Sequence, residues 1–236
     1  MRRIAILALV TAALVVSAAA ALAAQSPKAL RAKIVAAGLA QHSVHWVMKV
    51  KNRPPGPFFT FISDAGTDQG SQRLTLKVGS NSAHLTVELV DQTVYVKGDE
   101  AGLIDLQGLT GSQAHAYAGK WISIPKGDKD YADAADGLTI STLMHDSEPH
   151  GLLAIVRGKT NGKHFVGVSG TTGTGKRRLV TVLYAPAHGK KRPLKTVSTA
   201  PSDKKFSNST VFSKWNETVA VTAPESSTPI ATVRGG

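Results

Sequence analysis

The chain has 236 residues, a formal charge of +12 and no cysteine, so it is long enough for one full core or two small ones, and a small scaffold stapled by disulfides is excluded. A basic protein is attracted to anionic surfaces such as lipid headgroups, wall polymers or nucleic acid. Aromatic residues make up only 6% of the chain, and they do not alternate with basic residues, so no nucleic-acid partner is expected.

Residues 1–24 have the order of a secretory signal peptide. Two arginines precede an apolar run over residues 4–21, and small residues follow directly. We predict that this leader is cleaved, and the loss of its two arginines lowers the charge from +12 to +10. A bacterial lipoprotein would carry an acylated cysteine where Gln25 stands, so we expect an unlipidated protein that is secreted or soluble in the periplasm or cell envelope. The alternative is an uncleaved membrane anchor, which is disfavoured because the apolar run is short and alanine-rich for a span.

The first element of the mature chain is a predicted helix over residues 28–38. Ser26 can cap its N-terminus, and Pro27 suits the first helical position because the missing N–H has no partner there. Gly38 is interpreted as the C-terminal stop of this helix.

After this helix the apolar pattern changes to a period of two. Val44, Trp46 and Met48 point to one side of a strand, whereas His45 and Lys49 point to the other. Such alternation is typical of an antiparallel sheet with one apolar face and one solvent-facing side. Strands with this pattern are predicted at residues 42–50, 73–78, 83–89 and 93–97.

The middle of the chain is helical in pattern, and the second half returns to strands. The Asn161-Gly162 pair between two strand-like runs is a strong hairpin signal, because both positions of that turn favour positive φ. Helices are predicted at residues 99–107, 110–118, 128–135 and 138–145. Strands are predicted at residues 120–125, 152–160, 163–171, 178–185, 193–200 and 206–214.

No motif in the chain predicts an enzyme. Residues 170–177 come within one residue of a phosphate-binding loop, but Arg177 replaces the hydroxyl residue that holds magnesium, and a strand-like run follows instead of a helix. A hairpin turn is the better interpretation. There is also no local nucleophile motif, so neither catalytic residues nor a cofactor are predicted.

Acidic and histidine residues do not predict a metal site. His145 and His150 flank a predicted loop and could converge, but no third ligand is evident. The acidic run lacks the spacing of a calcium loop and is interpreted as a solvated face. Its members are Asp128, Asp130, Asp133 and Asp136.

An ordered set of motifs resembles the LppX/LprG family of actinobacterial envelope lipoproteins over residues 28–224. The motifs are Val-Tyr-Val-Lys-Gly at 94–98, two short helices, Gly-Lys-Trp-Ile-Ser-Ile-Pro at 119–125, and Phe-Ser-Lys-Trp-Asn-Glu-Thr-Val at 212–219. The resemblance implies a LolA/LolB-like fold, in which a half-open antiparallel sheet curls around helices and leaves an apolar cavity. It also implies binding of acylated lipids or lipoglycans and their movement through the envelope. The chain departs from the family pattern at Gln25, where the lipidated cysteine is absent.

Together these observations predict an α+β protein with one lipid-binding domain over residues 25–223 and a flexible C-terminal tail over 224–236. The predicted function is that of an exported, monomeric, non-enzymatic carrier of an acylated lipid or lipoglycan. The candidate cavity residues are Val44, Trp46, Met48, Phe59, Phe61, Leu74, Leu76, Leu85, Val87, Leu89, Val94, Val96, Leu103 and Leu106.

Two alternatives stay open at this point. The same apolar side chains would equally form a filled core, which would favour a basic interaction protein associated with the envelope or cell wall. Separately, Lys49, Arg73 and Lys77 lie on the opposite face of their strands and suit contact with an anionic membrane surface.

Overall fold

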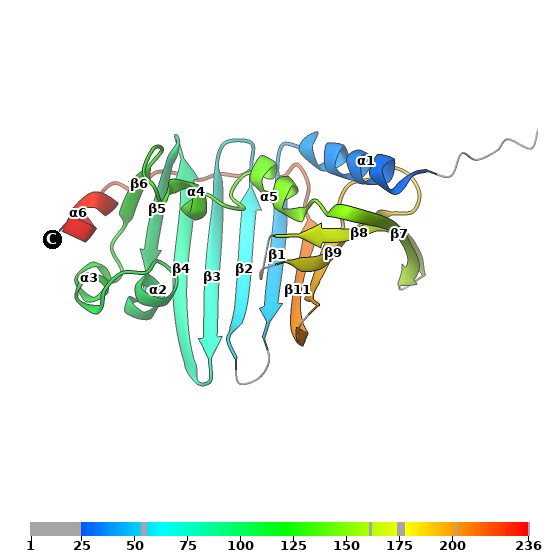
Figure 1. Cartoon of the computed structure of the whole chain (residues 1–236). Coiled ribbons are helices and arrows are strands. Elements are labelled where there is room, and N and C mark those ends of the chain that lie inside the picture. The colour runs from blue at the N-terminus through cyan, green and yellow to red at the C-terminus, as the bar shows by residue number, and fades with distance from the viewer. Residues whose placement is uncertain (1–24, 53–55, 161, 174–177, 202, 236) are drawn as a thin grey trace, which may run out of the picture.

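The computed structural model describes residues 25–235, except 53–55, 161, 174–177 and 202 (Figure 1). The predicted leader at residues 1–24 lies outside the described residues. So does Asn161 of the predicted hairpin turn, although the strands that it would join are paired with each other.

All strands of the described residues belong to one open sheet, which confirms the predicted α+β fold with an antiparallel sheet. The order across the sheet is β12-β6-β5-β4-β3-β2-β1-β11-β10-β9-β8-β7, and only β12 and β6 pair in parallel. Because β1 pairs with β11, the two halves of the chain join in the middle of the sheet. The strands are β1 (Val44–Lys51), β2 (Phe58–Ala65), β3 (Gly70–Val78), β4 (Asn81–Val90), β5 (Thr93–Gly98), β6 (Ile122–Pro125), β7 (His150–Thr160), β8 (Lys163–Thr172), β9 (Leu179–Pro186), β10 (Lys195–Ala200), β11 (Asp203–Ser213) and β12 (Thr228–Pro229).

The alternation in the sequence explains the strands β1, β3, β4 and β5, which lie where they were predicted. Strand β2 was not predicted as a strand, since its residues Phe-Phe-Thr-Phe-Ile-Ser-Asp-Ala do not alternate cleanly between apolar and polar. The turn at Asp91 and Gln92 has positive φ at both residues, as a tight hairpin requires.

Six helices lie within the described residues: α1 (Pro27–Leu39), α2 (Glu100–Asp105), α3 (Gly111–Tyr117), α4 (Tyr131–Ala134), α5 (Ile140–Ser147) and α6 (Ile230–Gly235). The Ser26 side chain accepts a hydrogen bond from the backbone N–H of Ala29, which confirms the predicted cap of α1. The predicted role of Gly38 is wrong, because the residue lies inside the helix. A Cβ at Gly38 would clash with Sδ of Met144, so glycine permits close packing between α1 and α5.

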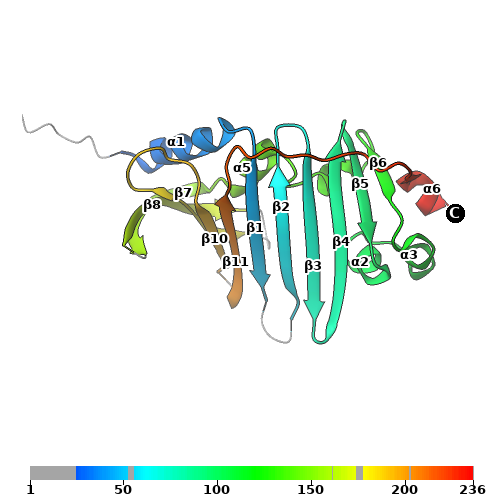
Figure 2. The same cartoon turned by 180° about the vertical axis from the view of Figure 1, so that it is seen from behind.

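The helices cover one face of the sheet and form two separate core clusters. Leu103, Ala114 and Ile230 from α2, α3 and α6 pack on β4, β5 and β6. At the other side, Ile34 of α1 and Met144 of α5 pack with residues of β1, β8, β9 and β11. Figure 2 shows the opposite face of β1 to β4, over which no helix lies. Residues Tyr131 and Ala134 of the short helix α4 pack against the first cluster, and Ile140 at the start of α5 belongs to the second.

The C-terminal residues pack against the sheet, so the predicted flexible tail at 224–236 is wrong as far as residue 235. After β11 the chain runs along the ends of the strands, as Figure 2 shows, and Gln69 donates a hydrogen bond to the Val219 carbonyl at 2.9 Å. Strand β12 then pairs with β6, and Ile230 and Val233 of α6 are each only 1% exposed. Burial of these two apolar side chains offsets part of the entropy lost when the segment becomes ordered.

In the described part of the chain, none of the helices combines the length and the apolar character that a membrane crossing needs.

Candidate ligand-binding cavity

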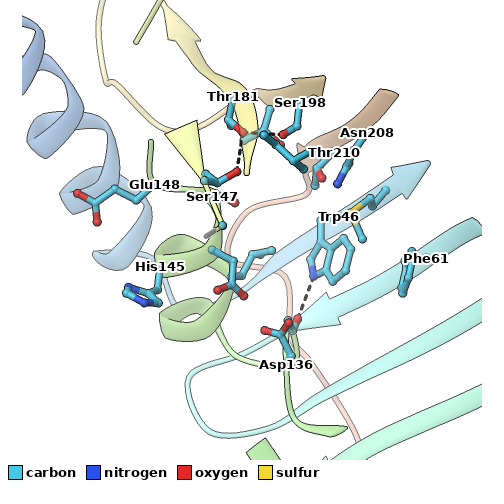
Figure 3. A pocket seen from close by; sticks show the side chains of 18 of the residues that line it. Trp46, Phe61, Asp136, His145, Ser147, Glu148, Thr181, Ser198, Asn208 and Thr210 are labelled. Atoms are coloured by element: carbon cyan, nitrogen blue, oxygen red, sulfur yellow. Dashed lines mark hydrogen bonds between the residues drawn. The ribbon is translucent and has the colours of Figure 1, made fainter. Parts of the chain in front are cut away.

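A cavity of about 590 Å³ lies on the helix-bearing face of the sheet, between the two core clusters (Figure 3). Strands β1, β2 and β3 supply one wall, and strands β8 to β11 supply the facing wall. The segment before α5 and α5 itself contribute Gly137, Leu143 and Ser147. The cavity exists because the helices fill both ends of the concave face but leave the region between α4 and α5 open.

The β1–β3 wall is apolar and partly aromatic, except for Gln72 of β3. Met48, Phe61 and Leu74 are direct cross-strand partners, so they form a continuous row across β1, β2 and β3. Trp46 stacks on Phe61 with 6.4 Å between ring centroids, and Phe61 stacks on Phe59 at the same spacing. This wall can contact an apolar chain along its length.

Trp46 is held in place by the segment that precedes α5. Its indole N–H donates a hydrogen bond to the carbonyl of Gly137 at 3.1 Å. Gly137 has φ of +71°, and a Cβ at this position would lie 2.8 Å from the Trp46 ring. Only glycine combines this backbone conformation with this close approach at low cost.

The opposite wall is polar and hydroxyl-rich, although it lies within the fold. Thr172 and Thr181 share a hydrogen bond of 2.7 Å, and Thr181 and Ser198 share one of 2.8 Å (Figure 3). Thr196 and Thr210 are direct partners on β10 and β11 and are only 6% and 5% exposed. A buried polar group without a hydrogen-bond partner costs about 1–3 kcal/mol, so this wall favours contents that can donate and accept hydrogen bonds.

Two carboxyl groups meet at the side of the cavity formed by α5. Burial, together with a hydrogen bond and charge repulsion from Asp136, raises the pKa of Asp146 to about 7. Asp146 lines the cavity and stays exposed to solvent there, so its desolvation is partial. Near neutral pH the Asp146 carboxyl group is therefore partly protonated.

The acidic run is solvated only in part: Asp133 and Asp136 are exposed, as predicted, whereas Asp128 and Asp130 are half-buried. Asp130 forms an ion pair with Arg234 of α6, while Asp133 and Asp136 line the cavity. Tertiary packing draws these residues to the cavity because α4 is only one turn long, so the carboxylates do not form a single exposed helical face.

The structure divides the predicted cavity residues into three groups. Four of them line the cavity, namely Trp46, Met48, Phe61 and Leu74. Leu74 also borders a smaller hollow of about 220 Å³, which is lined in addition by Leu85, Val87, Val96 and Leu106. Five others are packed in the core, namely Val44, Leu76, Leu89, Val94 and Leu103. Phe59 belongs to none of these groups and stacks on Phe61. The prediction treated the whole apolar face as one site, whereas helices fill most of it. Contact of any of these side chains with a ligand stays a prediction.

The polar wall of the cavity was not predicted. Thr181, Thr196, Ser198 and Thr210 occupy alternate positions of β9, β10 and β11 that face inward. The sequence signal that could have found it is the alternation of hydroxyl residues along these strands. A strand face that carries several hydroxyls is unusual inside a filled core. The sequence alone could not show which face of the sheet these hydroxyls occupy, because that depends on the pairing of β11 with β1.

The predicted histidine pair does lie near the cavity. Both His145 and His150 line it. Among the residues that the structure describes, no three histidine or carboxylate side chains gather closely enough to hold a metal ion. Of the predicted turn at 170–177, residues 170–172 belong to strand β8, and residues 174–177 lie outside the described residues.

No protein-family model matches the chain, and no curated protein sequence is significantly similar to it. Among solved structures, the chain is similar to LprF from Mycobacterium bovis, with a TM-score of 0.55, 19% identity, and coverage of 85% of this chain and 98% of that chain. An uncharacterized conserved protein from Thermus thermophilus matches with a TM-score of 0.44, 12% identity, and coverage of 87% and 98%. A LolA superfamily protein from Nitrosomonas europaea matches with a TM-score of 0.33, 8% identity, and coverage of 83% and 95%.

The similarity to LprF extends over nearly the whole of that protein, so the chain has the fold of LprF. The open antiparallel sheet with helices on one face agrees with the LolA-like, LppX-type fold that the sequence resemblance implied.

Proposed function

We propose that this chain is an exported, non-enzymatic carrier that binds an acylated lipid or lipoglycan in the cavity and moves it through the cell envelope. The observation that carries this proposal is the cavity of about 590 Å³ beneath α5, with an apolar wall on β1–β3. Ligand sites in proteins have volumes of roughly 300–1,000 Å³. A filled core of the kind that an interaction protein needs would not leave this space. The sequence resemblance to the LppX/LprG family and the fold shared with LprF favour the same function.

The physical basis of carriage is the transfer of an acyl chain from water to the apolar wall. Each buried methylene contributes about 0.8 kcal/mol. Trp46, Met48 and Phe61 present a surface on which several methylenes can lie, so a chain that water rejects can be held without covalent attachment. Release then requires a membrane or an acceptor protein that offers the chain a similar environment.

Native mass spectrometry of the mature protein, purified from its own host without detergent, tests the carrier function. We expect adducts with the masses of acylated lipids that disappear on organic extraction. A variant with a filled cavity, Ser198→Phe, should lack these adducts while its thermal unfolding stays cooperative. A bare mass together with no uptake of a fluorescent lipid by the unmodified protein would exclude the carrier function.

A second proposal concerns contact with an anionic membrane surface. Lys49, Arg73 and Lys77 are exposed, and they alternate along β1 and β3 with the inward-facing Met48, Gln72 and Leu74, so they lie on the opposite face of the sheet. A second group of basic side chains lines a shallow groove of about 900 Å³ near the β7–β8 hairpin, including Arg157 and Lys159. Binding to anionic vesicles should weaken steeply with salt, and charge reversal at Arg73 and Lys77 compared with reversal at Arg157 and Lys159 identifies the face involved. Vesicle binding that does not depend on ionic strength excludes this proposal.

The alternative function is that of a basic interaction protein of the envelope or cell wall. The same exposed basic side chains favour it, since they need no cavity to bind an anionic polymer. The two functions differ in their response to Ser198→Phe, which should leave polymer binding unchanged. Both functions imply a monomer released from its leader, which the mass of the exported protein checks directly.

A further inference from the structure

Several polar side chains of the cavity have no hydrogen-bond partner among the residues that the structure describes. Thr196, Thr210 and Gln72 are all more than nine-tenths buried and line the cavity. Among the described residues, the side chains of these three make no hydrogen bond, and the Oδ1 atom of Asn208 beside them is buried and also lacks a partner. Figure 3 shows Thr210 and Asn208 together on the side of the cavity that faces Trp46.

These side chains place a requirement on whatever occupies the cavity. Water can satisfy them while no ligand is bound, but a ligand that displaces this water must replace its hydrogen bonds or lose affinity. A purely apolar chain along the β9–β11 wall would leave Thr196, Thr210 and Asn208 without partners. The ligand therefore needs its own donors and acceptors at the β9–β11 wall.

The size of the cavity limits the ligand to one chain. A cavity of roughly 150 Å³ accommodates one benzene molecule, which corresponds to roughly 25 Å³ for each non-hydrogen atom. On this scale, the volume of about 590 Å³ holds roughly two dozen non-hydrogen atoms. That number suits one saturated chain with a compact polar group, and a lipid with two or three long chains would extend out of the cavity.

The chemistry of the polar wall also restricts the charge of the polar group. Thr181, Ser198 and Thr210 supply neutral hydroxyls, and neutral groups offset little of the penalty for burying an ion. The carboxyl groups of Asp133 and Asp136 also line the cavity, on the adjoining side, and repel an anion in addition. An uncharged head with hydroxyl or amide groups is therefore the best match.

We propose that the cavity binds a single-chain amphiphile whose uncharged, hydroxyl- or amide-bearing head is buried against Thr196, Thr210 and the neighbouring hydroxyls of β9–β11, with the chain along Trp46, Met48 and Phe61. This inference rests on the proposed carrier function and adds the ligand class and the orientation. It differs from a carrier that holds only the chains and leaves the head at the surface.

The test compares two probes with the same chain length, monododecanoylglycerol and dodecanoate, in displacement of a fluorescent fatty-alcohol probe from the mature full-length protein. We expect the neutral probe to displace at a concentration at least roughly tenfold lower than the anionic probe, since about 1.4 kcal/mol corresponds to a factor of ten. Equal or tighter binding of dodecanoate overturns the proposal.

Substitutions of threonine by valine, which has nearly the same shape, test where the head of the ligand lies. Thr196→Val and Thr210→Val should each weaken the binding of the neutral probe roughly tenfold, because each removes one hydrogen bond to the head of the probe. Thr196→Ser keeps the hydroxyl and should retain the affinity. Thr199→Val, on the exposed face of β10, is the matched control and should change nothing.

The outcomes separate the ligand class from the carrier function. If the neutral probe binds but both valine variants bind it as tightly as the unmodified protein, the buried-head orientation is wrong and the carrier function stands. If no probe enters the unmodified protein and no lipid adducts are found, the carrier function fails together with the inference.

Discussion

Gly137 is the residue at which the geometry of the cavity can be tested most directly. Two features of Gly137 disfavour a side chain at this position, namely its φ of +71° and the close approach of the Trp46 ring. Gly108 has the same φ of +71°, but a Cβ added there would meet nothing within 4 Å. Alanine at Gly108 therefore measures the cost of the backbone conformation alone, and alanine at Gly137 measures that cost together with the contact.

The expected losses in the free energy of unfolding follow from the backbone conformation and from the contact with the ring. A left-handed conformation costs a residue with a side chain roughly 1–2 kcal/mol, so Gly108→Ala should lower the free energy of unfolding by that amount. Forcing an additional methyl against a packed ring costs about 1–3 kcal/mol more. Since each kcal/mol shifts Tm by roughly 2–4 °C in a chain of this size, Gly137→Ala should unfold about 2–12 °C below Gly108→Ala.

Thermal unfolding followed by circular dichroism measures the difference, and uptake of a fluorescent lipid measures its consequence for the cavity. Gly137→Ala should also reduce lipid uptake, because displacement of the Trp46 ring breaks its hydrogen bond to the Gly137 carbonyl and moves the apolar wall. Equal destabilisation by the two substitutions would refute the reasoning, since the contact with Trp46 would then contribute nothing.

Three further predictions concern α6, the carboxyl pair and the cap of α1. Ile230→Ala should destabilise the fold by about 2–5 kcal/mol, whereas the exposed Thr232→Ala on the same helix should cost at most about 0.5 kcal/mol; equal small shifts in Tm would mean that α6 is not packed. Asp146→Asn should raise Tm more at alkaline than at acidic pH. The raised pKa of about 7, compared with the ordinary value of 3.8, means that the folded protein binds a proton that the unfolded chain releases, so this group's contribution to stability is present at low pH and is lost as the pH rises through 7. A pH-independent effect of Asp146→Asn on Tm would contradict this assignment. Ser26→Ala should cost about 1 kcal/mol through loss of the hydrogen bond to the Ala29 N–H, which denaturant unfolding would detect as a lower midpoint with an unchanged slope.

Local patterns determined much of the secondary structure. The hydrogen bond from the Ala29 N–H to Ser26, and Pro27 at the first turn, fix the start of α1 through residues only a few positions apart. Likewise, the alternation in β1, β3, β4 and β5 identifies strands because successive side chains in a strand point to opposite faces. The antiparallel sheet and the α+β class could therefore be predicted from the sequence.

The position of the cavity could not be predicted in the same way. Val94 and Leu74 both belong to the apolar face, but Val94 is packed beneath helices and Leu74 borders open space. The difference depends on where α2, α3 and α6 are placed over the sheet, and no local pattern contains that information.

The sequence by itself thus determined which segments are strands and helices and which face of β1–β5 is apolar. The tertiary structure decided that β11 pairs with β1, that residues 228–235 close the far edge of the sheet, and that hydroxyls of β9–β11 face Trp46 across a cavity. The physical reason is the range of the interactions involved. Capping and strand alternation act between near neighbours in the chain, whereas strand register and helix cover join residues more than a hundred positions apart, such as Met48 and Thr210.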